Sequence, residues 1–424
     1  MKIFLDMVGC RLNQSEIEAM ADSFREQGHR LVAGAREADL AIINTCAVTA
    51  EAGSDSRQKV RQAAGAGANQ VWVTGCWATL HPQEASALPG VSRVVPNSEK
   101  DNLPTLVFGP SNASVPELAR IHQPIPGDRW RTRAAIKVQD GCDNHCTFCA
   151  TRLARGSSRS VPIPDVVSRV RAAIAGGAKE VVLTGVSLSS WGEDLTPPLK
   201  IADLVEAILA KTGVTRLRLS SLEPWNLDAR FFSLWQDRRL CRHLHLPLQS
   251  GSGATLRRMA RRTGPEAYRQ LVETAREAIP GLAITTDVIV GFPGESEQEF
   301  EESLAFVRSM DFAGGHVFTY SENALTPSAK LPDSVPYPLR KERNARMREE
   351  LDKSAARYQR RFLGLQVPVL WEKQFPLDDG SYLVEGHTDN YLRVSALSPV
   401  PLRGAFSSVI LEEAGRNTVE GRLV

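Results

Sequence analysis

Hydrophobic positions in the first hundred residues alternate between short apolar runs and a helical spacing. The apolar runs, which are the predicted strands, lie at residues 3–5, 40–43 and 71–73. Ile17, Met20 and Phe24 recur at intervals of three and four residues, which is typical of an amphipathic helix. The order strand, helix, strand indicates a parallel sheet with crossover helices, so we predict an amino-terminal parallel α/β domain over residues 1–98.

A longer series of the same kind begins at residue 134. Its predicted strands are 134–138, 180–184, 216–220, 243–248, 284–290 and 316–320. Helical patterns lie between most of them, at 164–175, 201–211, 265–278 and 296–310. Six repeats favour a partial or full β/α barrel over residues 134–338, whose functional end is at the carboxyl ends of its strands.

Three further segments complete the predicted organisation. Residues 99–133 are rich in proline, glycine and polar residues, which is typical of a linker with some extended structure. Residues 339–363 form a basic connecting helix, because nine Lys or Arg and four acidic residues lie between Arg340 and Arg361. Over residues 364–424 the pattern changes to short strands at 367–371, 382–385, 391–394, 408–411 and 418–424. These fit a small antiparallel β-barrel of the oligonucleotide-binding type, and the fold class is α/β overall.

Composition narrows the possible classes of protein. The 424 residues are 42% hydrophobic and 24% charged, which excludes disordered, collagen-like and coiled-coil chains. The net charge of +2 means that any nucleic-acid site depends on local clusters of basic residues. No apolar run approaches the length of a membrane span, and the first residues lack a secretory hydrophobic region, so we expect a cytoplasmic protein and no membrane partner.

The seven cysteines are too few for a disulfide framework in a chain expected in the cytosol. Cys10, Cys46 and Cys76 each follow one of the first three predicted strands within a few residues. Because the carboxyl ends of parallel strands open on one edge of a sheet, these three thiols are expected to converge there. A shared ligand site is the favoured interpretation, and three buried core cysteines are the alternative.

Cys142, Cys146 and Cys149 form a Cys-x3-Cys-x2-Cys loop directly after the first predicted barrel strand. A structural zinc site needs four protein ligands, for which only His145 lies close in sequence. Three thiolates can instead hold three irons of a four-iron cubane and leave the fourth iron open. S-adenosylmethionine could bind that iron through its amine and carboxylate, and an electron from the cluster would then release a 5′-deoxyadenosyl radical able to abstract hydrogen.

With this loop, nearly the whole chain resembles the radical S-adenosylmethionine methylthiotransferases, which replace a C–H hydrogen with a methylthio group. The matching motifs are Gly9–Gln14, Asn44–Thr49, Thr74–Cys76, His245–Ser252 and Asp287–Glu295. Within the family, the chain looks most like members that act on threonylcarbamoyladenosine. The segments that carry this similarity are Gly9–Gln14, Ala47–Thr49, Ser56–Gln58, Ala154–Gly156 and Arg159–Ser160.

The resemblance implies two [4Fe-4S] clusters, one held by Cys142, Cys146 and Cys149 and one by the three amino-terminal cysteines. It also implies S-adenosylmethionine as methyl donor and radical source, a reductant protein, a sulfur donor, and a TRAM-like RNA-associated barrel at the carboxyl end. No catalytic side chain beyond the clusters is expected, because the radical performs the C–H chemistry. Cys241 matches neither cysteine group and is interpreted as a packing residue.

The substrate implied is N6-threonylcarbamoyladenosine next to the anticodon in tRNA. Isopentenyladenosine in tRNA and an aspartate of a ribosomal protein are the alternatives, and a non-enzymatic zinc-bearing RNA-binding protein is a remote one. The chain departs from the family where Ala150-Thr151-Arg152 replaces two aliphatic residues and a proline, and again at Glu322–Leu325. Both departures concern the identity of the modified base more than the type of reaction.

The remaining candidates for ligand or RNA contacts are chosen only from their positions in the sequence. Four residues near the predicted strand ends are candidates for contacts with S-adenosylmethionine, although structural roles would explain them equally: Phe148, Gly185, Gln249 and Asp287. Two basic clusters are candidates for RNA binding, with ordinary solvated surface as the alternative: Arg257, Arg258, Arg261 and Arg262, and Arg340 with Lys341.

Overall fold

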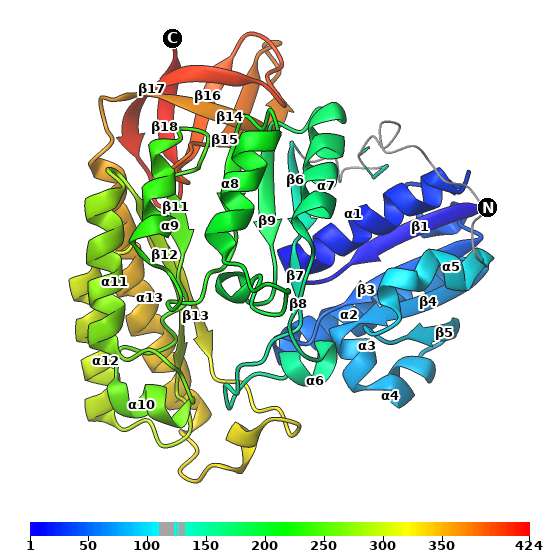
Figure 1. Cartoon of the computed structure of the whole chain (residues 1–424), viewed down its shortest axis with the longest axis horizontal. Coiled ribbons are helices and arrows are strands. Elements are labelled where there is room, and N and C mark those ends of the chain that lie inside the picture. Colours follow the sequence, from blue (N-terminus) through cyan, green and yellow to red (C-terminus); the bar gives the residue numbers. More distant parts are fainter. Residues whose placement is uncertain (110–122, 124, 127–131) are drawn as a thin grey trace.

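The computed structural model describes residues 1–109, 123, 125–126 and 132–424 of the chain. The chain forms an amino-terminal sheet, a central curved layer of strands with helices outside it, and a carboxy-terminal barrel at one end of the central part (Figure 1). Within the described ranges, no helix has both the length and the apolar character needed to cross a membrane.

The amino-terminal sheet has five parallel strands in the order β2-β1-β3-β4-β5. They are β1 (Lys2–Met7), β2 (Arg30–Leu31), β3 (Leu40–Thr45), β4 (Gln70–Gly75) and β5 (Val91–Val95). All of β3 is buried, because both faces of the sheet carry apolar packing. On one face α1 (Arg11–Glu26) buries Ile17, Met20 and Phe24, which confirms the amphipathic pattern. On the other face lies α2 (Ala50–Gly65).

The central part contains two parallel three-stranded sheets, in the orders β10-β9-β6 and β11-β12-β13. The strands are β6 (Arg133–Lys137), β9 (Glu180–Thr184), β10 (Leu217–Leu219), β11 (His243–His245), β12 (Ala283–Val290) and β13 (Gly314–Thr319). Parallel bridges from Leu217 to Leu240 and from Ser221 to His245 join the two sheets into one curved layer. Since β6 and β13 are its outer strands, the barrel is partial rather than complete.

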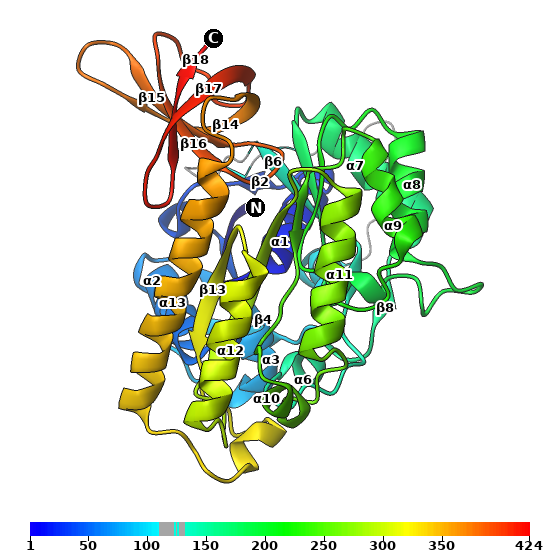
Figure 2. The ribbon, with the colours of Figure 1, turned by 90° about the vertical axis from the view of Figure 1, so that its left-hand side faces the viewer.

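Helices between the strands cover the outer face of this layer (Figure 1). The main ones are α7 (Ile163–Ala175), α8 (Ile201–Lys211), α11 (Pro265–Ala278) and α12 (Glu297–Met310). Helix α12 starts with a capping box, in which Ser296 and Glu299 each bond the other's backbone N–H, and it buries Phe300, Leu304 and Val307. The basic helix α13 (Tyr337–Arg360) packs against α12 and β13 and leads into the carboxy-terminal barrel (Figure 2).

The carboxy-terminal barrel is closed, with strand order β14-β15-β16-β18-β17. Its strands are β14 (Gln366–Pro376), β15 (Tyr382–His387), β16 (Arg393–Ser398), β17 (Phe406–Ala414) and β18 (Val419–Leu423). The expectation of a purely antiparallel barrel was wrong in one pairing, because β16 and β18 run parallel where the last strand closes the barrel. Tyr391, expected in a strand, lies before β16 with a left-handed φ of 66°.

The linker expected at 99–133 is partly helical. Residues 100–102 form a 3-10 turn, and α5 (Leu103–Phe108) follows it because Leu103 packs into the amino-terminal core. Most of the remainder, 110–122, 124 and 127–131, lies outside the described residues.

A buried ion pair connects the central strands with the carboxy-terminal barrel. Arg218 of β10 donates two hydrogen bonds to Glu180 of β9, at 2.7 and 3.1 Å, and both side chains are at most 1% exposed. The same guanidinium donates to the backbone carbonyls of Thr388 and Asp389 in the barrel. One buried arginine therefore joins the central strands to the carboxy-terminal barrel, and this arrangement is stable only while the carboxylate of Glu180 balances its charge.

Replacing Glu180 with glutamine is expected to lower the free energy of unfolding by about 3–5 kcal/mol, because Arg218 would stay buried without a negative partner. Urea unfolding followed by circular dichroism would measure the loss. Glu206→Gln is the matched control, since Glu206 pairs with Arg230 at 2.8 Å on the surface and should leave the unfolding curve unchanged. Equal curves for Glu180→Gln and wild type would contradict the anchoring role.

The same pair should make stability depend on pH. Burial raises the pKa of Glu180, but Arg218 outweighs it and lowers that pKa from 4.5 to about 2. The stabilisation is thus complete above about pH 4.5 and is lost as the pH falls towards 2, and it amounts to about 3 kcal/mol. In urea titrations at a series of pH values, the Glu180→Gln variant should lack this acid-dependent loss.

Candidate active site

The three amino-terminal cysteines follow three adjacent strands of the sheet. Cys10 follows β1, Cys46 follows β3 and Cys76 follows β4, and all three line one cavity of about 930 Å³. Cys46 is buried, Cys76 is partly buried and Cys10 is exposed to solvent. The parallel topology thus brings together three thiols that are far apart in the chain: Cys46 follows Cys10 by 36 residues, and Cys76 follows Cys46 by 30.

Two Gly-Cys pairs shape this group of thiols. Gly9 has a φ of +102°, and a Cβ placed on it would lie 2.5 Å from the Cys46 sulfur. Gly75 has a φ of +97°, and a Cβ there would lie 2.3 Å from the carbonyl oxygen of Thr45. Only glycine combines this backbone conformation with so close an approach, so both positions are required for the local path of the chain.

The second cysteine group lies in the loop between β7 (Gln139–Asp140) and α6 (Thr151–Arg155). Backbone and side-chain N–H groups of Asn144 donate to the Cys142 sulfur at 3.4 and 3.2 Å. The Thr151 backbone N–H donates to the Cys149 sulfur at 3.4 Å, and Arg261 donates to the Cys146 sulfur at 3.6 Å. Burial raises the pKa of the Cys142 and Cys149 thiols, and the donors from Asn144 and Thr151 offset part of this effect in favour of the thiolate form that binds iron.

The zinc alternative has little support in this loop. The imidazole nitrogens of His145 lie 2.9 and 3.0 Å from the guanidinium of Arg152, so this side chain already has a cationic neighbour. Nor do any three His, Cys, Asp or Glu side chains of the described ranges stand in an arrangement that could hold a single metal ion. A cubane differs from such a site because it separates its ligands by the width of the cluster.

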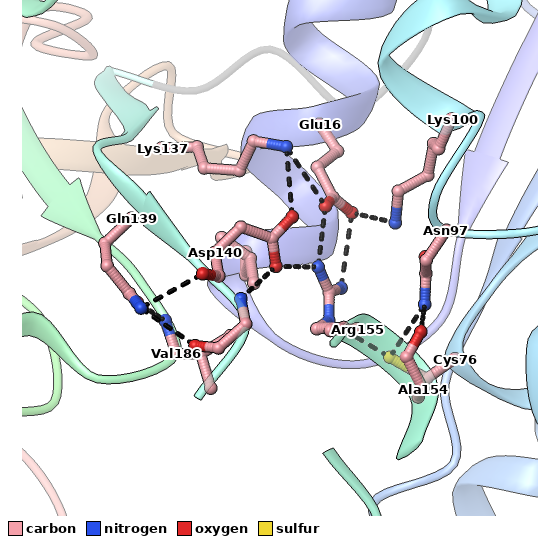
Figure 3. Close-up of polar contacts among 12 residues, drawn as sticks. Glu16, Cys76, Asn97, Lys100, Lys137, Gln139, Asp140, Ala154, Arg155 and Val186 are labelled. Carbon is pink, nitrogen blue, oxygen red and sulfur yellow. Dashed lines mark hydrogen bonds and ion pairs between the residues drawn. The ribbon is translucent and has the colours of Figure 1, made fainter. Parts of the chain in front are cut away.

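Arg155 contacts one of the amino-terminal thiols, Cys76, and several polar side chains (Figure 3). It lies in α6, directly after the Cys142–Cys149 loop, and its Nε donates to the Cys76 sulfur at 3.2 Å. Its other nitrogens donate to Glu16 at 2.8 Å, to Asp140 at 2.9 Å and to the Asn13 side chain at 2.9 Å. The guanidinium thus reaches the amino-terminal sheet from the central domain.

Charged side chains around Arg155 form a network of ion pairs next to Cys76. Lys100 donates to Glu16 at 2.6 Å, and Lys137 lies 3.3 Å from Asp140. Burial raises the pKa of Glu16, but Lys100 and Arg155 outweigh it and hold that pKa well below its usual range. Lys137 also pairs with Asp101 at 2.8 Å, so three cations face three carboxylates. Arg155 is placed to favour an anionic group at the cysteine because its own Nε–H donates to the Cys76 sulfur.

Gly185 and Asp287 line the cavity that contains the amino-terminal thiols. One carboxylate oxygen of Asp287 accepts a hydrogen bond from Nε2 of His245 at 3.2 Å, while its other oxygen is buried without a partner among the described residues. The hydroxyl of Ser220, also on the cavity wall, is unpaired in the same part of the chain. Unpaired polar atoms on a cavity wall are the expected feature of a ligand site.

Phe148 and Gln249 are placed differently. Phe148 packs edge-on against Phe292, with ring centroids 6.5 Å apart, beside a small apolar cluster. Gln249 has a left-handed φ of 70°, and its backbone bonds to Asp287 and Ile289. The geometry therefore gives both residues a structural role and leaves their proposed contacts with S-adenosylmethionine untested.

Three of the basic candidates for RNA binding bond to other parts of the protein. Arg340 is buried and donates to the carbonyls of Val335 and Tyr320. Arg258 pairs with Glu299, and Arg261 donates to the Pro247 carbonyl beside the cysteine loop. The expectation of an exposed RNA-binding side chain is corrected for Arg340, because packing buries it. For Arg258 and Arg261, which are half-buried, RNA binding stays a prediction. The exposed candidates are Arg257, Arg262 and Lys341.

Sequence reasoning missed an aromatic stack on the cavity wall. The ring of Tyr391 stacks on His243 of β11 at 4.2 Å and on His387 at 5.0 Å. His243 and His245 alternate with Leu244 along the strand, a polar spacing that indicates an interior-facing ligand surface. That alternation could have identified the two histidines from the sequence. No local pattern indicates that the carboxy-terminal barrel supplies Tyr391 to the same wall.

Comparisons with known proteins agree with this geometry. Residues 136–307 match the radical SAM superfamily, and residues 2–95 match an uncharacterized protein family, UPF0004. A threonylcarbamoyladenosine tRNA methylthiotransferase of Bacillus subtilis is 34% identical, covering 98% of this chain and 95% of that protein. The Thermotoga maritima enzyme of the same name is 35% identical over 87% of this chain and 86% of its own length.

A tRNA-2-methylthio-N(6)-dimethylallyladenosine synthase of Symbiobacterium thermophilum is 30% identical, covering 100% of this chain and 94% of that protein. Among solved structures, the radical S-adenosylmethionine methyltransferase TsrM of Kitasatospora setae has a TM-score of 0.57 at 14% identity. The match covers 77% of each chain and shows a shared fold.

Radical SAM proteins use S-adenosylmethionine and a [4Fe-4S] cluster. The Cys142–Cys149 loop fits such a cluster, because its three partly buried sulfurs receive N–H donors and it lies within the matched residues 136–307. The full-length similarity extends this assignment beyond the central domain. The chain therefore belongs to the radical S-adenosylmethionine methylthiotransferase family.

Proposed function

We propose that this enzyme adds a methylthio group to a C–H position of N6-threonylcarbamoyladenosine next to the anticodon of tRNA. The choice of substrate rests on sequence identity to relatives that are named for different substrates. Those named for threonylcarbamoyladenosine are 34% and 35% identical, whereas one named for dimethylallyladenosine is 30% identical. Dimethylallyladenosine, also called isopentenyladenosine, is the second candidate.

We infer that each cysteine group holds its own [4Fe-4S] cluster. Cys142, Cys146 and Cys149 would hold the one that S-adenosylmethionine joins, and Cys10, Cys46 and Cys76 the other. Together these groups supply radical hydrogen abstraction and sulfur transfer. The N–H donors at the loop sulfurs and the positive charge of Arg155 at Cys76 support anionic sulfur at both places.

The protein's own residues would shape the cavity beside the amino-terminal cysteines. Asp287 and Ser220 offer unpaired polar atoms to a ligand, and Gly185 lets backbone approach it closely. We propose that residues 134–338 form the radical domain, that 1–98 form the sulfur-supplying domain, and that 364–424 form a TRAM-like RNA-associated barrel. A reductant protein and a sulfur donor complete the proposed set of partners.

An anaerobic assay tests this function. Protein reconstituted with iron and sulfide would receive S-adenosylmethionine, a reductant and tRNA that carries threonylcarbamoyladenosine, and digested nucleosides would be read by mass spectrometry. The methylthio derivative is the expected product. Product only from dimethylallyladenosine, or only on a ribosomal-protein aspartate, would select one of the alternatives, and zinc without iron would select the RNA-binding one.

Binding of tRNA is expected to weaken steeply with salt, because cationic side chains release counterions from phosphates. Replacing Arg257, Arg262 and Lys341 together by glutamine should weaken binding and lower the slope of log affinity against log salt by up to about 1 per residue. Fluorescence anisotropy at several salt concentrations measures both quantities. Lys2→Gln, a change on the exposed amino terminus, is the control, and an unchanged slope in the triple variant would remove these residues from the interface.

A further inference from the structure

The cavity beside the amino-terminal thiols is lined by all three parts of the chain. Four arginines lie on its wall: Arg11, Arg155, Arg393 and Arg416. Three of them have carboxylate partners, since Arg155 pairs with Glu16 and Asp140, Arg393 with Glu385, and Arg416 with Asp352. For Arg11, no carboxylate of the described ranges lies within ion-pair distance. The cavity therefore holds one arginine whose charge the protein leaves uncompensated.

Arg11 is nevertheless held in a fixed place. Its Nη2 donates to the Tyr391 hydroxyl at 2.6 Å, and its guanidinium carbon lies 5.8 Å from the centre of that ring. Tyr391 is itself fixed between His243 and His387, with the His243 ring within 8° of parallel. An oriented guanidinium loses less freedom when it binds a ligand than a mobile one does.

The surroundings of this pair are electropositive. Burial raises the pKa of Tyr391, yet Arg11, Arg133 and Arg218 outweigh it and lower that pKa overall. Glu180 neutralises Arg218, and Glu372 lies 2.9 Å from Arg133, whereas Arg11 faces the cavity. An anionic group that enters the cavity would meet its unpaired cation at Arg11.

Arg11 directly follows Cys10, so this cation lies beside the proposed sulfur-supplying group. The threonylcarbamoyl group carries a carboxylate, whereas the dimethylallyl group has no charge. A guanidinium binds a carboxylate with two parallel hydrogen bonds, and this match exceeds what lysine can offer. An uncharged prenyl group would offer this guanidinium no anionic partner.

We propose that Arg11, oriented by Tyr391, binds the carboxylate of the substrate's threonylcarbamoyl group and thereby sets the choice of adenosine; this inference rests on the proposed function. Tyr391 is the positioning residue. The carboxy-terminal barrel thus takes part in recognition of the modified base, in addition to any contact with the RNA backbone.

The test compares two anticodon stem-loops that differ in one group. One carries threonylcarbamoyladenosine and the other carries its primary carboxamide, which keeps the shape and removes the charge. Wild type should bind and modify the acid better than the amide. Arg11→Gln should lower kcat/KM and affinity for the acid by about 10- to 100-fold and leave the amide nearly unchanged, as expected for loss of a charge-assisted hydrogen bond.

Further variants separate recognition from folding. Arg11→Lys keeps the charge without the planar fork and should retain part of the preference, while Tyr391→Phe keeps the stacked ring and should raise KM for the acid alone. Arg393→Gln is the matched control, because that cavity arginine is already paired with Glu385 and its loss should leave the acid-to-amide ratio unchanged. Iron content and anisotropy of RNA binding report on each variant independently of turnover.

The outcomes distinguish the two proposals. If wild type modifies the acid and Arg11→Gln keeps the full preference for it, the carboxylate site is wrong while the proposed function stands. If Arg11→Gln lowers acid and amide equally with its iron content intact, Arg11 has a general role and the inference also fails. If wild type ignores the acid and modifies only a dimethylallyl stem-loop, both proposals fall together.

Discussion

Alanine in place of Cys142, Cys146 and Cys149 is expected to abolish both cleavage of S-adenosylmethionine and product formation. Iron per chain should fall from about eight to about four, because one of the two proposed four-iron clusters cannot form. The same substitution of Cys10, Cys46 and Cys76 should also remove about four irons and the product, but it should leave S-adenosylmethionine cleavage intact. Iron analysis and chromatography of 5′-deoxyadenosine measure these effects.

Cys241→Ala is the matched control for both triple variants. Cys241 is buried near Glu180, and burial raises the pKa of its thiol to about 12, so it is protonated and serves as packing. Its variant should retain about eight irons and product formation. Product from a protein that lacks the thiols of the Cys142–Cys149 loop would contradict the assignment of that loop, and with it the proposed reaction.

Arg155→Met is expected to be the most damaging substitution outside the cysteines. Its guanidinium side chain is 2% exposed, and its removal leaves Glu16 and Asp140 buried with fewer cations and Cys76 without its donor. Loss of one partner from such a buried network costs about 3–5 kcal/mol. We expect an earlier urea transition, and iron content lowered towards that of the Cys10, Cys46 and Cys76 variant.

Arg159→Met controls for loss of an arginine from the same region. Arg159 is 54% exposed and lies 3.9 Å from Asp140, so its contribution is weakened by solvent. Its variant should unfold and bind iron like wild type. If Arg155→Met behaved in the same way, the network would be dispensable, and the positive charge next to Cys76 would not serve the cluster site.

Much of the fold follows from local patterns. The helix at 201–211 and the strand at 180–184 were predicted to the residue, because hydrophobic periodicity and nearby start and stop signals are properties of adjacent residues. The Cys142–Cys149 loop could also be identified from spacing alone, since one short segment supplies all three thiols. Convergence of the three amino-terminal cysteines was predictable because parallel strands end at one edge.

Interactions between distant segments were not predictable in this way. Arg340 belongs to a basic run that resembles an exposed surface, yet packing against 320–335 buries it. Nor does a charge run reveal which arginine finds a carboxylate. The solvation and pairing of each side chain depend on which other elements fold against it, and this is set by domain packing.

The sequence by itself determined the order of domains, the two sets of thiols and the family, because each depends on composition, period or spacing within short stretches. Only the tertiary structure decided that Arg155 joins Cys76 to Glu16 and that Arg11 meets Tyr391, a residue 380 positions away. The physical reason is that burial and charge compensation are properties of neighbours in space, and segments far apart in the chain supply those neighbours here.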